Sequence, residues 1–383
     1  MAFAPDGRTF ATGSADGTVM VWELAELHRQ VGPPLTGHPG EVWGAAFTPD
    51  GRTLATAGDT VVLWDLTKRD RPRQLGQLLT GNTAKVWGVT IALDGRTLAT
   101  ANANGTVSVW DLTDRKQPHP LGQPLTGLAD AVYAVAFTPD GRTLATADSD
   151  ETVILWDLTD RDRPRPLGQP LTGHTDSVLA VAFAPDGRTL ATGGADGTVM
   201  VWDLTDRDRP QPLGQPVTGQ KNVIFGLAFA PDGRTLAAAR DDGTIVLSDL
   251  TDRDRPHQLG QPLTGHTGGV SAVAFAPDGR TLATASVDRT ARLWNMSDRN
   301  LPIPIGQPLT GHTDSVNTVA FAPDGRTLVT AGADRTVRLL DLSHLGEIPK
   351  SPVREACIRA GGALDEATWN VYAPGVRYHD TCA

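Results

Sequence analysis

The stretch GHTDSVLAVAFAPDGRTLATGGADGTVMVWD, residues 173–203, is one copy of a unit that repeats along most of the chain. Its Asp-Gly-Arg-Thr tetrapeptide recurs with the aspartate at positions 6, 50, 94, 140, 186, 232, 278 and 324, spaced by 44, 44 and then five times 46 residues. A fixed period of this length is typical of repeat folds, in which neighbouring units bury a common core. We therefore treat residues 1–342 as one repeat domain and residues 343–383 as a C-terminal tail.

Each unit predicts short β-strands joined by tight turns. In the unit at Gly173 we expect strands at Val178–Ala184, Thr189–Gly193 and Thr198–Leu204, separated by Pro-Asp-Gly and Ala-Asp-Gly turns. These runs are too short for typical helices, and the first is apolar on both faces, so its sheet must be covered on both sides. A charged connector follows, and Gln215–Thr218 then adds a fourth strand at the sheet edge, where proline is tolerated. The pattern predicts an all-β fold, a β-propeller of four-stranded antiparallel blades.

Composition excludes several classes of function. The 383 residues carry a net charge of −10 and a pI near 5.3, which disfavours nucleic-acid binding. The longest apolar runs are strand-length, so we expect no membrane span, and the first residues lack a signal-peptide pattern. We therefore expect a cytoplasmic protein. The two cysteines, Cys357 and Cys382, both lie in the tail, and the sequence leaves open whether they are bridged.

Gly-His before the first strand and Trp-Asp at the end of the third resemble the WD-repeat family over about residues 1–342. The tail, with its Cys357, Trp369, Tyr378 and Cys382, looks like one that follows such arrays in actinobacterial multidomain proteins. The resemblance implies a hydrogen-bonded His, Thr, Asp and Trp set inside each blade, structural and not catalytic. The expected sets are His38, Thr56, Asp59 and Trp64; His174, Thr192, Asp196 and Trp202; and His266, Thr284, Asp288 and Trp294.

Other units depart from this set. Asn82, Leu128 and Gln220 stand at the histidine position, and Ser248 and Leu340 stand at the tryptophan position. A buried tryptophan removes ~150–250 Å² from water. We therefore expect the units that contain Ser248 and Leu340 to be the looser ones.

The number of blades stays open between eight and seven. The first copy begins in mid-strand at Met1, and we hypothesise that the natural reading frame extends upstream. An eight-bladed ring with an incomplete first blade is favoured. A seven-bladed ring closed by Pro34–Thr36 would leave four apolar side chains without one set of neighbours: Phe10, Val19, Val21 and Trp22. In the tail, Val353–Ala360 and Leu364–Tyr372 are predicted to be short helices that cover the last blade.

One position varies while its neighbours hardly change, just after the opening Val or Ile of each first strand. It carries Trp43, Trp87, Tyr133, Leu179, Phe225, Ser271 and Asn317. In WD-repeat proteins the corresponding position lies at the rim of the central channel, on the face that binds partners. Glu41 and Lys85, two residues before it, and Asp241, before a turn aspartate, belong to the same face. Trp43, Trp87 and Tyr133 come from successive units, so we expect an aromatic arc, either as an interface anchor or as packing at the channel mouth.

The chain lacks a phosphate-binding loop, an HExxH motif and a Gly-x-Ser-x-Gly elbow, and we predict no cofactor and no metal site. The favoured function is a non-catalytic interaction or sensing scaffold in a larger bacterial signalling protein, with a protein or peptide partner. The alternative is a propeller hydrolase or lyase with its site at the channel mouth, built from Glu41, Lys85, Asp241 and Asn317. The oligomeric state is not determined by the sequence.

Overall fold

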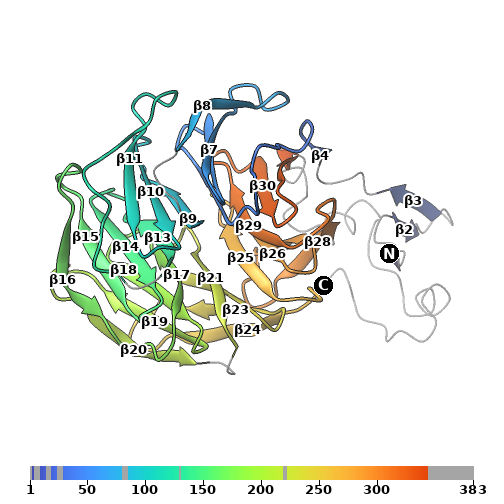
Figure 1. The fold of residues 1–383 in the computed structure, drawn as a ribbon. Helices are drawn as coiled ribbons and strands as arrows, with labels where there is room; N and C mark the ends of the chain where they lie inside the picture. The colour runs from blue at the N-terminus through green and yellow to red at the C-terminus, as the bar shows by residue number, and fades with distance from the viewer. Residues whose placement is uncertain are drawn as a thin grey trace.

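The computed structural model describes residues 29–79, 85–128, 131–218 and 222–343, together with the backbone of three short strands before them (Figure 1). Within these ranges the chain forms seven four-stranded antiparallel sheets and no α-helix. The first strand of each sheet contacts the first strand of the next, and β29 of the seventh sheet contacts β5 of the first. The seven sheets are therefore the blades of a closed propeller.

The blades have the same strand order, from the innermost strand outwards. Blades one to three contain β5 (Gly44–Phe47), β6 (Thr53–Ala57), β7 (Val61–Asp65) and β8 (Arg73–Leu79); β9 (Val86–Ile91), β10 (Thr97–Asn102), β11 (Val107–Asp111) and β12 (His119–Pro120); and β13 (Val132–Phe137), β14 (Thr143–Asp148), β15 (Val153–Asp157) and β16 (Arg165–Leu171). Blades four and five contain β17 (Val178–Phe183), β18 (Thr189–Gly194), β19 (Thr198–Asp203) and β20 (Gln211–Thr218); and β21 (Ile224–Phe229), β22 (Thr235–Arg240), β23 (Ile245–Asp249) and β24 (His257–Leu263). Blades six and seven contain β25 (Val270–Phe275), β26 (Thr281–Ser286), β27 (Ala291–Asn295) and β28 (Ile303–Leu309); and β29 (Val316–Phe321), β30 (Thr327–Gly332), β31 (Val337–Asp341) and β4 (Arg29–Gln30).

The strand predictions for the unit at Gly173 are confirmed. Strands β17, β18 and β19 match the predicted ranges to within one residue at each end, and the predicted edge strand is present as β20. It begins at Gln211, earlier than the predicted Gln215, and pairs its Pro212 with Trp202 at the outer edge of the blade. An outer strand can hold proline because its missing N–H faces solvent and no further strand.

The Asp-Gly-Arg-Thr turn between the first two strands is held by its own aspartate. In blade four, Gly187 has a φ of +65°, in the left-handed region that glycine adopts without steric cost. A carboxylate oxygen of Asp186 accepts hydrogen bonds from the backbone N–H groups of Arg188 and Thr189, at 2.8 and 3.1 Å. The turn sequence therefore fixes a sharp reversal that aligns the inner strands of every blade.

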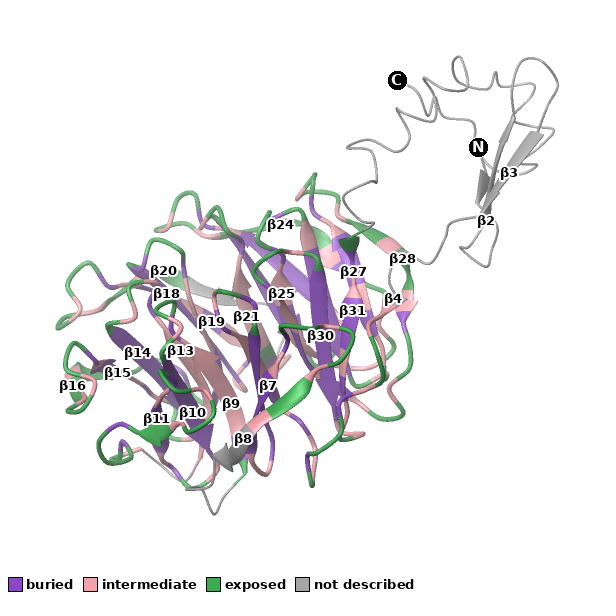
Figure 2. Cartoon of the chain, turned by 90° about the horizontal axis from the view of Figure 1, so that it is seen from above, coloured by how far each residue is buried: buried purple, intermediate pink, exposed green. Residues whose placement is uncertain are grey.

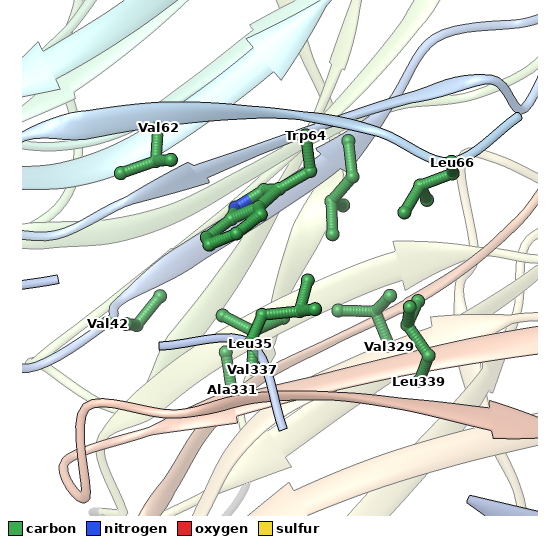
Figure 3. Packing of buried hydrophobic residues seen from close by; sticks show 10 residues of the cluster. Leu35, Val42, Val62, Trp64, Leu66, Val329, Ala331, Val337 and Leu339 are labelled. Atoms are coloured by element: carbon green, nitrogen blue, oxygen red, sulfur yellow. The ribbon is translucent and has the colours of Figure 1, made fainter. Parts of the chain in front are cut away.

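The hydrophobic core lies between the blades, as one cluster at each of the seven interfaces. Six of the seven second strands, such as β18, are buried along their whole length, because sheets cover both of their faces (Figure 2). Figure 3 shows the cluster between the last blade and the first, where Trp64 and Val62 of β7 face Val329 and Val337 of the seventh blade. Each blade is thus stabilised by its two neighbours, as in other repeat proteins.

The favoured eight-bladed ring is wrong, and the seven-bladed alternative is correct. Strand β4 pairs with β31, and Leu35 forms an isolated bridge with Val337, so residues 29–35 supply the outer strand of the last blade. The first copy forms a separate three-stranded sheet of β1 (Ala2–Phe3), β2 (Thr9–Gly13) and β3 (Val19–Glu23). With only two residues in β1, that copy lacks a full inner strand, whereas β4 both completes the seventh blade and closes the ring.

Two predictions fall on parts that the structure does not describe. The side chains of Phe10, Val19, Val21 and Trp22 lie outside the described residues, as do both predicted helices of the tail and its two cysteines. Within the described ranges, no helix has the length and apolar character needed to cross a membrane.

Candidate partner-binding rim

The variable position is a β-bulge in the inner strand of six blades. In blade four, Val178 pairs with Gly194 and Ala180 pairs with Gly193, so Leu179 is an extra residue without a partner in the second strand. The same register shift occurs at Trp87, Tyr133, Phe225, Ser271 and Asn317. Bulges re-aim a side chain and release it from cross-strand packing. This explains why this position tolerates side chains from Trp to Asn while its neighbours hardly change.

The predicted aromatic arc is present. The rings of Trp43 and Trp87 lie 4.9 Å apart between centroids and are tilted by 68°, an edge-to-face contact. The rings of Trp87 and Tyr133 lie 6.4 Å apart and are tilted by 47°. All three side chains are half-buried, and they come from blades one, two and three. Edge-to-face contacts between aromatic rings contribute about 0.5–1.5 kcal/mol each, so the three rings stabilise one another at the rim.

Polar groups border the arc on one side. Lys85 is exposed, and its ammonium lies 6.0 Å from the ring centroid of Trp87, at the outer limit of a cation–π contact. The indole N–H of Trp87 is buried and has no hydrogen-bond partner among the described residues. An unpaired buried donor of this kind costs about 1–3 kcal/mol. Among the described residues, the arc therefore combines apolar area, one cation without an ion pair and one donor that lacks an acceptor.

The other predicted rim residues do not join this arc. Phe225, in blade five, is 42% exposed and makes no ring contact with the arc. Asp241 is exposed in the same blade, whereas Glu41 is half-buried in the loop before β5. The side-chain amide of Asn317 donates to the backbone carbonyl of Val42 at 3.1 Å and so links the seventh blade to the first. The four polar residues considered for an enzyme site are thus spread over blades one, two, five and seven.

The predicted structural sets are confirmed in two blades. In blade four, His174 lies 3.0 Å from Asp196 and 2.8 Å from Thr192, and the indole N–H of Trp202 donates to the Thr192 hydroxyl at 3.1 Å. In blade six the same set is formed by His266, Thr284, Asp288 and Trp294. Burial lowers the pKa of His266 against the opposing effect of Asp288, so the imidazole is neutral near pH 7. Buried histidines with both ring nitrogens hydrogen-bonded fit a structural role.

The first blade forms only part of its predicted set. His38 lies 2.7 Å from the hydroxyl of Thr56, and Trp64 donates to the same hydroxyl at 2.9 Å. Asp59 is not bonded to His38, whose Nδ1 is buried without a hydrogen-bond partner among the described residues. The turn that carries Asp59 is two residues shorter than in other blades, which places the carboxylate toward Gly40. Burial lowers the pKa of His38 to about 4.

The seventh blade contains a His, Thr and Asp set that was not predicted from the sequence. His312 lies 2.9 Å from Asp334 and 2.8 Å from Thr330, although Leu340 stands at the tryptophan position. The sequence contains Gly311-His312 and Asp334 at the expected spacing. The set was not predicted because the unit lacks the tryptophan that completes it. In the described part of the chain, no three His, Cys, Asp or Glu side chains gather in a group that would hold a metal ion.

Comparison with known proteins agrees with this architecture. A search of curated protein sequences found no match to the chain. The family model "WD domain, G-beta repeat" (WD40) matches residues 1–23, 30–65, 73–111, 121–157, 165–203, 212–249, 257–295 and 304–341. Seven of these matches fall on the ring, and the match at residues 1–23 falls on the separate sheet of β1, β2 and β3. Because the matches cover most of the sequence, the chain belongs to the WD40 repeat family.

Proposed function

We propose that this chain is a non-catalytic interaction or sensing scaffold that binds a protein or peptide partner on the rim formed by Trp43, Trp87 and Tyr133. Propellers of the WD40 family typically serve as scaffolds for protein interactions. The observation that supports this rim as the docking site is the mutual contact of three half-buried aromatic side chains from three successive blades.

Aromatic side chains are the usual anchors of protein interfaces, because they bury a large area for few rotatable bonds. In the arc, each ring already packs on its neighbour along one edge and remains partly open to solvent. A partner that covers the open faces gains the remaining area. The central ring, Trp87, contacts both others and is expected to contribute most.

The arc is also rigid, which lowers the cost of binding. The residues that precede the three rings in the chain, Val42, Val86 and Val132, are fully buried between blades. Each ring is therefore attached to backbone that cannot move without opening the core. Binding to a preorganised surface avoids much of the entropy that is lost when flexible side chains are immobilised.

The polar groups next to the arc define the partner's chemistry. The exposed ammonium of Lys85 favours a carboxylate next to an apolar side chain. The unpaired indole N–H of Trp87 favours a carbonyl oxygen of the partner, which requires a small rotation of the ring on binding. An acidic peptide with an apolar or aromatic residue matches both requirements. We further propose that the protein acts in the cytoplasm, within a larger bacterial signalling protein, on the basis of its acidic charge and of the family resemblance of its tail.

The test begins with affinity capture from the source cell and identification of the retained proteins, followed by titration of the purified main partner. We expect the triple variant Trp43→Ala, Trp87→Ala, Tyr133→Ala to bind the partner with a Kd at least a hundredfold higher. This corresponds to a loss of about 2.7 kcal/mol or more of binding free energy. Ser271→Ala is the matched control, because Ser271 occupies the same bulge position in blade six. It should leave the Kd within twofold. An unchanged Kd in the triple variant, with the fold intact by circular dichroism, rejects the proposal.

A further inference from the structure

Six arginines tie six of the seven blades to the blade before them, on the opposite end of the sheets from the aromatic arc. Each arginine lies in the connector between the third and fourth strands, and its guanidinium pairs with the aspartate of the Asp-Gly-Arg-Thr turn in the preceding blade. The pairs are Arg69 with Asp324, Arg115 with Asp50, Arg161 with Asp94, Arg207 with Asp140, Arg253 with Asp186, and Arg299 with Asp232.

In five of the six pairs the arginine also donates to the hydroxyl of the threonine in the same turn. In blade one, Arg115 donates to the hydroxyl of Thr53 at 3.0 Å and to the carboxylate of Asp50 at 2.8 Å. In blade three, Arg207 binds Thr143 and Asp140 at 2.9 and 2.8 Å. We call this aspartate and threonine the arginine station of a blade. In the six occupied stations, each threonine is buried to 2% exposure or less: Thr53, Thr97, Thr143, Thr189, Thr235 and Thr327.

The seventh station, Asp278 and Thr281 in blade six, receives no arginine from the described residues. The six arginines are spaced by 46 residues, and the next position in this series is Leu345. Asp278 accepts a hydrogen bond from the backbone N–H of Arg280 at 2.9 Å, but no described arginine pairs with it. Thr281 is half-buried, unlike the threonines of the other six stations.

The turn that carries this station is built like the others. Gly279 has a φ of +68°, close to the +65° of Gly187. The spacing of the two blades can be compared at the turn glycines. A Cβ atom placed on Gly325 of blade seven would lie 3.5 Å from Pro277 of blade six. A Cβ atom placed on Gly187 of blade four would lie 3.4 Å from Pro139 of blade three. The two blades therefore approach each other as the other blades do, and the sequence difference is that Leu345 stands where the other connectors carry the arginine. The same interface also lacks a tryptophan, because Leu340 stands in its cluster.

We propose that Asp278 and Thr281 form a guanidinium-binding site that holds Arg354 of the C-terminal segment 344–383. This segment starts at the connector that delivers the arginine in every other blade. It carries three arginines, Arg354, Arg359 and Arg377, and Arg354 is the first of them. Binding of Arg354 closes a shorter loop after residue 343 than binding of Arg359 or Arg377 would. The shorter loop costs less conformational entropy. The bond docks the segment across the interface of blades six and seven.

Limited proteolysis of the full chain with trypsin tests this assignment, because the protease cleaves after Arg354 only when its side chain is free. We expect Asp278→Asn to raise the cleavage rate after Arg354 at least tenfold. Asp232→Asn is the matched control, since Asp232 forms the neighbouring station and holds Arg299. It should change the rate less than twofold. Equal rates in Asp278→Asn and the unmodified protein overturn the proposal, and so does an equal rise in both variants.

A second variant separates docking from loss of structure. Leu345→Arg restores the arginine at its position in the repeat, so it should fill the station, release Arg354 and raise the cleavage rate, with no loss of thermal stability. Paired exchange of charges, Asp278→Arg with Arg354→Asp, should restore resistance to the protease at the neighbouring Lys350. If Asp278→Asn raises the cleavage rate after Arg359 or Arg377 and not after Arg354, the assignment is rejected. Protection that falls on dilution indicates an arginine from a second copy and rejects it as well.

Discussion

Leu35 and Val337 exchange two backbone hydrogen bonds, from the N–H of Leu35 to the carbonyl of Val337 at 2.7 Å and in the reverse direction at 3.1 Å. These residues lie near opposite ends of the described chain, and their side chains share the cluster in Figure 3. The ring is therefore closed by the outer strand of its last blade. Closure of this kind joins distant parts of the chain, so it carries a loop-closure cost that only the completed ring repays.

Leu35→Ala is expected to open this closure. The side chain is 6% exposed, and truncation of a buried leucine costs about 2–5 kcal/mol. Leu171→Ala is the matched control, because Leu171 has the same exposure and the same place in the outer strand of blade three. Hydrogen exchange should show faster exchange of the Val337 amide in Leu35→Ala, whereas Leu171→Ala should leave that amide protected. Similar exchange at Val337 in both variants would mean that closure depends on other contacts.

Blades five and seven should be less protected than blade four. Trp202 is 4% exposed in the cluster between blades three and four, whereas Ser248 and Leu340 occupy its position in blades five and seven. A buried tryptophan contributes up to ~4–6 kcal/mol of apolar burial, as an upper bound. Native-state hydrogen exchange measures the difference directly. Equal protection of the amides in β19, β23 and β31 would contradict this prediction.

The stability of the protein should fall as the pH drops from about 6.5 to 4, in part because of His38. Burial lowers the pKa of His38 to about 4, from 6.5. The unfolded state therefore binds a proton in this range that the folded state does not, and the contribution is present above pH 6.5 and lost toward pH 4. The expected size is roughly 3 kcal/mol. Urea unfolding of the unmodified protein and of His38→Gln at pH 7.5 and pH 4.5 provides the measurement, and the variant should lose less stability between the two pH values.

Substitutions in the aromatic arc should cost less stability than substitutions in the cores. Trp43 is half-buried at the rim, whereas Trp64 is 4% exposed inside the first interface and donates to Thr56. Trp64→Ala is expected to lower the free energy of unfolding by about 3–5 kcal/mol, and Trp43→Ala by about 1 kcal/mol. Thermal unfolding of the two variants gives the comparison. Equal losses would identify the arc as core packing and not as a surface available to a partner.

The repeat unit alone determined the blade. Its Pro-Asp-Gly turns, its short apolar runs and the Gly-His and Trp-Asp pairs predict the strands, and β17, β18 and β19 confirm them. The variable position was also visible, because alignment of the copies places Trp43, Trp87 and Tyr133 in register. These features follow from local chemistry, in which each residue's neighbours in the chain decide its conformation.

Only the tertiary structure decided which strand closes the ring and which groups pair between blades. Residues 29–35 can follow their own copy or complete the last blade, and the sequence of that strand is compatible with either edge. The connector arginines stand beside aspartates in the sequence, yet they bind the aspartates of the preceding blade. Asn317 lies at the rim but bonds to Val42 across the closure. Such pairings depend on the curvature of the whole ring, which sets how many blades fit before the first and last sheets meet, and no single repeat contains that information.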